Sequence, residues 1–258
     1  MIMLAEYADK YPSIRMQREN GILEVTLHTN GDSLRWNWTV HTELPNAFAD
    51  IAADRETKVV IITGAGAEFI GPQVAEGANP LLAQKPSFEM ADRVILEGKQ
   101  LLTNLLNIDV PVISAVNGPT WRHSAVALLA DIVLASETAC FQDSGHFRAG
   151  HVPGDGHHIV FPLLLGWNRA RYFLLTGQVI SAAEAKDLGL VAEVLPKERL
   201  LPRAWELAEK LAANPIHLLR MTRIVLTERL KREVQEMIGY GLQTQFLAAM
   251  GAPEEVLS

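Results

Sequence analysis

Strand-like apolar runs alternate with helix-like patterns over residues 1–196, and only helix-like patterns follow from residue 197 onward. Asn20-Gly21 separates strands predicted at 13–18 and 22–28, and this pair of residues is a strong signal for a β-hairpin turn. The apolar run at 58–63 is short enough to be a buried strand. The alternation predicts an α/β fold whose ligand site lies where strand ends meet loops.

The C-terminal part is predicted to be helical, with helices at 197–213, 216–231 and 233–249 and a break at Pro215. We therefore expect two parts of the chain, a core at 1–196 and a helical region at 197–258. The chain has neither an internal repeat at solenoid periods nor a low-complexity segment.

The charge balance excludes several classes of partner. The net charge is −7 and the sequence pI is near 5.6, so the chain lacks the basic footprint of proteins that bind nucleic acid or anionic membranes. Its N-terminal residues do not resemble a signal peptide, and its apolar runs fall short of the roughly 18 residues of a membrane helix. Cys140 is the only cysteine, which fits a reducing compartment. We expect a cytoplasmic protein.

Histidines and aspartates gather in one glycine-rich segment, CFQDSGHFRAGHVPGDGHH at 140–158. Imidazole is the side chain whose ordinary pKa best suits a general base near neutral pH, and a carboxylate can fix its tautomer. We expect His146 to be that base, paired with Asp155 across the intervening loop. The alternative is a structural role, in which these histidines cap loops or form hydrogen bonds with the backbone.

Two other hydrolase classes have weaker signals. Gly31-Asp32-Ser33-Leu34 spells the GDSL block of a serine hydrolase family, but the D-x-x-H at 155–158 lies about a hundred residues before the chain end. The histidines also lack the H-E-x-x-H spacing of a zinc hydrolase. We therefore expect neither a catalytic serine nor a metal ion.

The order of several segments resembles the crotonase superfamily. They are VVIITGAGAEF (59–69), VPVISAVNGP (110–119), ADIVLASETACFQ (130–142) and RYFLLTGQVISAAEAKDLGLVAEVLP (171–196). The resemblance implies a spiral of repeated ββα units with a helical C-terminal oligomerisation region, assembled as a homotrimer or a dimer of trimers. It also implies an oxyanion hole with backbone N–H donors near Gln73 and His123, which would stabilise a developing enolate.

The departures from that pattern point to one branch of the superfamily. The two glutamates that hydratases use fall here on Val126 and His146, so hydration by a pair of carboxylates is not expected. The segments SLRWNWTVHTEL (33–44), NGPTWRHS (117–124), FQDSGHFRAG (141–150) and VPGDGHH (152–158) are instead similar to 6-oxocamphor hydrolase and related β-diketone hydrolases. The active-site groups of that branch fall on Trp36, His41, His123, His146 and Asp155, and a family glutamate is replaced by Gln245.

The resemblance implies cleavage of a carbon–carbon bond in a small β-diketone without a cofactor. Water loses a proton to His146 as it attacks one carbonyl, and the bond breaks to release an enolate. The candidate donors to the enolate oxygen are His123, Trp36 and His41, and the product is a keto acid. The alternative within the same fold is an enzyme that acts on an acyl-CoA thioester.

Overall fold

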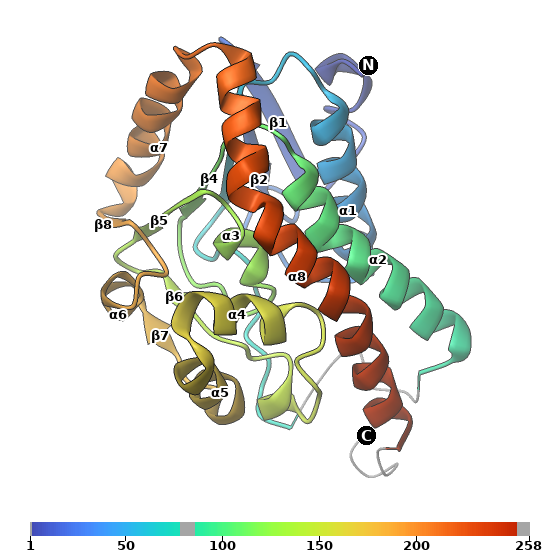
Figure 1. Cartoon of the computed structure of the whole chain (residues 1–258). Helices are drawn as coiled ribbons and strands as arrows, with labels where there is room; N and C mark the ends of the chain where they lie inside the picture. Colours follow the sequence, from blue (N-terminus) through green and yellow to red (C-terminus); the bar gives the residue numbers. More distant parts are fainter. Residues whose placement is uncertain (1, 78–85, 252–258) are drawn as a thin grey trace.

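A computed structural model describes residues 2–77 and 86–251, and its centre is a six-stranded sheet (Figure 1). The strand order is β1 (Ile14–Glu19), β2 (Ile22–Leu27), β3 (Val59–Gly64), β4 (Val112–Val116), β5 (Ile132–Ser136) and β8 (Glu193–Leu195). β1 is antiparallel to β2, and every later pairing is parallel. Two short strands, β6 (Cys140–Phe141) and β7 (Ile180–Ser181), form a separate antiparallel pair. The α/β class predicted from the sequence is confirmed.

The first hairpin has the turn that the sequence predicts. Asn20 and Gly21 both have positive φ angles, 49° and 81°, and the pairing register joins Glu19 to Ile22. Two successive residues with positive φ are the requirement of a type I′ turn, which Asn-Gly meets at low cost. This hairpin fixes the position of β2, against which β3 then adds in parallel.

The central strands are buried on both faces, as parallel strands covered by helices usually are. In β3, Val60 and Ile62 pack into the larger core cluster, while Val59 and Ile61 pack against α7 (Lys197–Ala212). The other helices are α1 (Trp38–Ala53), α2 (Phe88–Asn107), α3 (Ala125–Leu128), α4 (His157–Leu165), α5 (Trp167–Thr176), α6 (Ala182–Asp187) and α8 (Ile216–Gly251). The sheet therefore separates α7 from the core that contains α1, α2 and α8.

Side chains cap the N-terminal ends of α1 and α2. The Asn37 side chain accepts a hydrogen bond from the backbone of Val40 at the start of α1. The Ser87 hydroxyl accepts one from Met90 at the start of α2. Such caps satisfy backbone N–H groups that have no partner inside the helix. α1 and α2 pack along each other, so both caps help to set one wall of the site (Figure 1).

The C-terminal region differs from the prediction in one respect. Residues 216–231 and 233–249 belong to one continuous helix, α8, and not to two. Nothing near residue 232 breaks helical geometry, since the intervening residues are good helix formers without proline or glycine. Around Gly71 the chain forms isolated bridges, Arg35–Gly71 and Ile70–Thr120.

α8 crosses the molecule over α2 and is anchored near its first turns (Figure 1). The buried guanidinium of Arg223 donates to Asp131 at 2.6 Å and to the Leu106 carbonyl at 3.1 Å. These contacts join α8 to the end of α2 and to the residue before β5. Within 2–77 and 86–251, every helix is too short or too polar to cross a lipid bilayer.

Candidate active site

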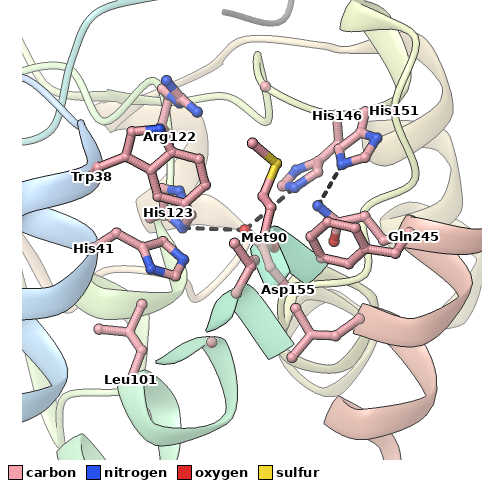
Figure 2. A pocket seen from close by; sticks show the side chains of 15 residues that line it. Trp38, His41, Met90, Leu101, Arg122, His123, His146, His151, Asp155 and Gln245 are labelled. Carbon is pink, nitrogen blue, oxygen red and sulfur yellow. Dashed lines mark hydrogen bonds and ion pairs between the residues drawn. The ribbon is translucent and has the colours of Figure 1, made fainter. Parts of the chain in front are cut away.

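A cavity lies between α1, α2, α8 and the loops that follow β4 and β6, with an empty volume of about 620 Å³ that includes its mouth (Figure 2). One part of its wall is apolar and consists of Trp38, Met90, Val94, Leu101, Leu242 and Phe246. The other part is polar and consists of His41, Arg122, His123, His146, His151, Asp155 and Gln245. A cavity with one apolar wall and a few converging polar groups is the usual form of a site for small organic molecules.

Asp155 is the centre of the polar wall. Its Oδ2 atom lies 3.1 Å from Nδ1 of His123 and 3.3 Å from Nε2 of His146 (Figure 2). Its Oδ1 atom lies 3.0 Å from Nδ1 of His157. Asp155 comes just before α4, so the loop at 150–156 carries it to the cavity. His146 and Asp155, which the sequence pairs, therefore share one cavity, and His123 joins them.

The closest partner of His146 is Asp143, which is not among the site residues predicted from the sequence. Nδ1 of His146 lies 2.5 Å from Oδ1 of Asp143, a residue that is 1% exposed. Burial lowers the pKa of His146, but Asp143 and Asp155 raise it more, to about 10. Burial raises the pKa of Asp143, yet His146 and His157 hold it below its ordinary value. His146 is therefore an imidazolium between two carboxylates at neutral pH.

His123 has the opposite environment. Burial lowers its pKa to about 3, against the attraction of Asp155, so the ring is neutral at neutral pH. The Trp36 ring stacks on it, with centroids 3.5 Å apart and an interplanar angle of 21°. His123 also has a φ of 46°, which is uncommon for a residue other than glycine and costs about 1 kcal/mol or more. Ring stacking and backbone geometry together fix where this imidazole lies.

His157 is a further buried histidine of this cluster and lies at the start of α4. Its Nδ1 faces Asp155, and its Nε2 lies 3.1 Å from the Ser124 hydroxyl. Burial lowers the pKa of His157, but the charges of Asp143 and Asp155 raise it by more, so the net shift is upward. In the sequence, these hydrogen-bonded pairs were marked only by short separations, three residues from Asp143 to His146 and two from Asp155 to His157.

His41 belongs to a second pair of imidazole and carboxylate. Its Nδ1 atom lies 2.6 Å from Oε2 of Glu97, so α1 and α2 meet at the cavity through this contact. Glu97 also accepts from Thr42 at 2.9 Å and from Arg93 at 3.0 Å. Burial raises the pKa of Glu97, but these donors lower it more, which keeps the carboxylate ionised. No sequence pattern indicated Glu97.

Gln245 reaches the cavity from α8, as the resemblance implies. Its Nε2 atom lies 2.6 Å from Nε2 of His151, another histidine to which the sequence assigned no role (Figure 2). Burial lowers the pKa of His151 to about 3, and the nearby charge of His146 adds to this. A neutral amide and a neutral imidazole therefore face each other in this part of the cavity wall.

Two expected residues lie outside the cavity lining. Trp36 stands behind His123 and holds it by stacking, whereas Trp38 is the tryptophan that lines the cavity. The side chain of Gln73 donates to Oε1 of Gln142 at 2.7 Å and is not among the lining residues. Ser33 of the GDSL block instead accepts hydrogen bonds from the backbone of Ala67 and Glu68 in a loop.

Asp143, His146 and His157 bring potential metal ligands within 4.8 Å of one another. Two ligands bound tetrahedrally to zinc at about 2.0 Å would lie about 3.3 Å apart. The 2.5 Å between His146 and Asp143 is shorter and has the geometry of a shared proton. The group fits a hydrogen-bonded cluster better than a metal centre.

Comparisons with known proteins agree with this fold. The model of the enoyl-CoA hydratase/isomerase family matches residues 17–249. A probable enoyl-CoA hydratase, EchA12 of Mycobacterium tuberculosis, is 32% identical over 202 residues, which cover 74% of this chain and 68% of that protein. An enoyl-CoA hydratase/isomerase from Mycobacterium paratuberculosis has a similar fold, with a TM-score of 0.83, 24% identity and coverage of 95% and 97% of the two chains.

A β-diketone hydrolase from the cyanobacterium Anabaena sp. PCC 7120, bound to (S)-3-oxocyclohexyl acetic acid, is a nearer relative. It is 47% identical with a TM-score of 0.89, covering 95% of this chain and 97% of that one. The crotonase resemblance read from the sequence is thereby confirmed. The chain belongs to the enoyl-CoA hydratase/isomerase family.

Proposed function

We propose that this protein hydrolyses a carbon–carbon bond of a small β-diketone and releases a keto acid. The observation that carries the proposal is the placement of two imidazoles with opposite protonation states on one oxygen of Asp155, beside an apolar wall. The likeness to the Anabaena β-diketone hydrolase supports the same reaction class.

The opposite pKa shifts assign the roles of the two histidines. Environments that push the pKa values of neighbouring groups apart mark one as the acid and one as the base. His123 is neutral, and with its Nδ1–H directed at Asp155 its Nε2 can accept the proton of the attacking water. His146 is protonated and donates to the oxygen on which negative charge develops. This reverses the roles expected from the sequence, because His146 is held protonated between Asp143 and Asp155.

The proposed steps balance without a cofactor. The water oxygen bonds to one carbonyl carbon while its proton passes to Nε2 of His123. The tetrahedral adduct then expels the adjacent carbon with the electron pair of the broken bond, and the second carbonyl spreads that charge onto its oxygen as an enolate. His123 returns the proton to the enolate carbon, which leaves a ketone and a carboxylic acid that ionises.

The apolar wall indicates the shape of the substrate. Trp38, Leu101 and Phe246 offer contact to a hydrocarbon ring or chain, while the carbonyl oxygens face the histidines. The position of the first hydratase glutamate, Val126, is fully buried in α3 and offers no acid or base. A β-diketone with a compact hydrocarbon body therefore suits this chain better than an enoyl thioester that needs two carboxylates.

We further propose that the protein acts as a homotrimer or a dimer of trimers. Large apolar side chains are exposed on α5, such as Trp167 and Tyr172, and on α8, such as Val225 and Leu226. Faces of this kind usually mark contacts with another protein surface. Sedimentation velocity of the full chain measures the assembly, and a monomer at micromolar concentration would contradict this proposal.

Turnover assays test the reaction. Cyclic and linear 1,3-diketones are incubated with the full chain, and loss of the ultraviolet absorbance of the enol is followed with and without a chelator. We expect chelator-insensitive turnover of cyclic diketones that falls by about 100-fold or more in His123→Asn. Turnover of crotonyl-CoA with no diketone consumed would overturn the proposal in favour of the thioester alternative.

A further inference from the structure

Arg122 is a cation of the cavity that the proposed reaction does not use. Its side chain is buried, with the residue 4% exposed, and it lines the same cavity as His123 and Asp155. Among the described residues its Nε has no hydrogen-bond partner, and Asp155 and Asp143 act on its charge without a hydrogen bond to it. Figure 2 draws it on the side of Trp38, away from His151 and Gln245.

The other deeply buried arginine shows what a structural role looks like in this fold. Arg223 is 2% exposed and donates to Asp131 at 2.6 Å and to the carbonyl of Leu106. A buried charge without such partners is costly, and proteins commonly pair it or expose it. Within the described residues Arg122 has no such partner and is not exposed to solvent, so a purely structural role does not explain its burial.

The two carboxylates whose charges act on Arg122, those of Asp155 and Asp143, already have other partners. Asp155 is contacted by His123, His146 and His157, and Asp143 is held by His146. Because His146 is protonated, one positive charge already balances part of this carboxylate pair. The guanidinium of Arg122 is therefore free to meet an anion that enters the cavity.

We propose that Arg122 binds the carboxylate of a small organic acid whose hydrocarbon body lies on the apolar wall. Guanidinium suits this task because its planar N–H groups match the two oxygens of a carboxylate. The carboxylate has two sources, the acid released by cleavage or an acidic substituent of the substrate. Only the first source rests on the proposed function.

Calorimetric titration tests binding without turnover. Cyclohexylacetate and its neutral isostere cyclohexylacetamide are titrated into the wild-type protein, Arg122→Gln, Arg122→Lys and the control Arg232→Gln, which changes an exposed arginine. We expect the wild type and the control to prefer the acid by about tenfold or more. Arg122→Gln loses that preference, and Arg122→Lys keeps part of it because it keeps the charge.

Equal affinity of the wild type for acid and amide would overturn the inference, as would a full preference in folded Arg122→Gln. Should Arg122→Gln fail to fold, the wild-type comparison and Arg122→Lys still decide. A protein that prefers the acid but consumes no diketone would refute the proposed function and leave this inference standing.

Kinetics separate the two sources of the carboxylate. A diketone that carries a carboxylate is compared with its methyl ester. A lower KM for the acid that disappears in Arg122→Gln identifies the substituent. Equal KM values, with competitive inhibition by cyclohexylacetate in the wild type alone, identify the released acid.

Discussion

Nδ1 of His146 lies 2.5 Å from Oδ1 of Asp143, and this contact sets the protonation state of the candidate active site. Asp143 is buried and contacts one ring nitrogen, while the other, Nε2, is 3.3 Å from Oδ2 of Asp155. A histidine held in this way keeps its proton well above neutral pH, to a pKa of about 10. The pH dependence of the protein should follow from it.

The rate should fall at alkaline pH. If His146 donates to the developing charge, kcat/KM decreases as the pH rises through about 10, where His146 loses its proton. In Asp143→Asn the carboxylate that raises this pKa is absent, and the fall should move toward neutral pH. Initial rates from pH 5 to 11 measure both. A rate that instead climbs toward pH 10 would make neutral His146 the base and remove that role from His123.

Stability should be greatest near pH 6.5. The pKa of His146 is raised to about 10, so its contribution to the free energy of unfolding is complete below its ordinary pKa of 6.5 and is lost as the pH rises toward 10. The pKa of His123 is lowered to about 3, so its contribution is present above pH 6.5 and is lost as the pH falls toward 3.

Urea unfolding at several pH values checks this prediction. His146→Gln should flatten the alkaline arm of the stability curve, and His123→Asn should flatten the acidic arm. The same alkaline slope in His146→Gln as in the wild type would show that another group causes it.

Glu97 should act on the reaction through His41. Glu97→Gln keeps the size of the side chain but removes the charge that faces Nδ1 of His41 at 2.6 Å. We expect kcat to fall by about tenfold with little change in KM, because outer partners that orient a histidine have effects of this size. Glu97→Asp, which retains the carboxylate, should recover part of the rate.

Two glycines of α8 form a matched pair. A Cβ at Gly241 would lie 2.4 Å from the carbonyl oxygen of Gly154, the residue before Asp155. We expect Gly241→Ala to lower the free energy of unfolding by about 1–3 kcal/mol and to reduce kcat/KM by displacing Asp155.

Gly239→Ala is the control for that change. A Cβ there meets only the flexible end of Lys99, at 3.1 Å, and the change should stabilise the helix by up to about 1 kcal/mol. Urea unfolding and initial rates of both variants give the comparison. Equal activity in Gly241→Ala and the wild type would show that α8 does not position Asp155.

The sequence predicted the parts of the fold that local patterns determine. Asn20-Gly21 and the run at 58–63 identified a hairpin and a buried strand, because turn chemistry and apolar runs are local signals. The predicted division of α8 into two helices was wrong, since no proline or capping residue marks a helix end near residue 232.

The candidate site was predicted only where a local pattern in the sequence marked its residues. Clustering drew attention to His146 and Asp155, and the structure places both on one cavity. Glu97 was missed because its partner His41 lies on another helix, and tertiary packing alone brings them together. The protonation states were also beyond reach, since they depend on which carboxylates surround each ring.

The continuity of α8 has a consequence for how this cavity tolerates change. About six helical turns separate the anchor at Arg223 from Gln245 at the cavity. One residue inserted between them would rotate everything beyond it by about 100°, carrying Gln245 and Phe246 away from the wall they complete. Which α8 side chains face the cavity depends on their rotation about the helix axis, so natural length variation should avoid this helix or come in near-whole turns.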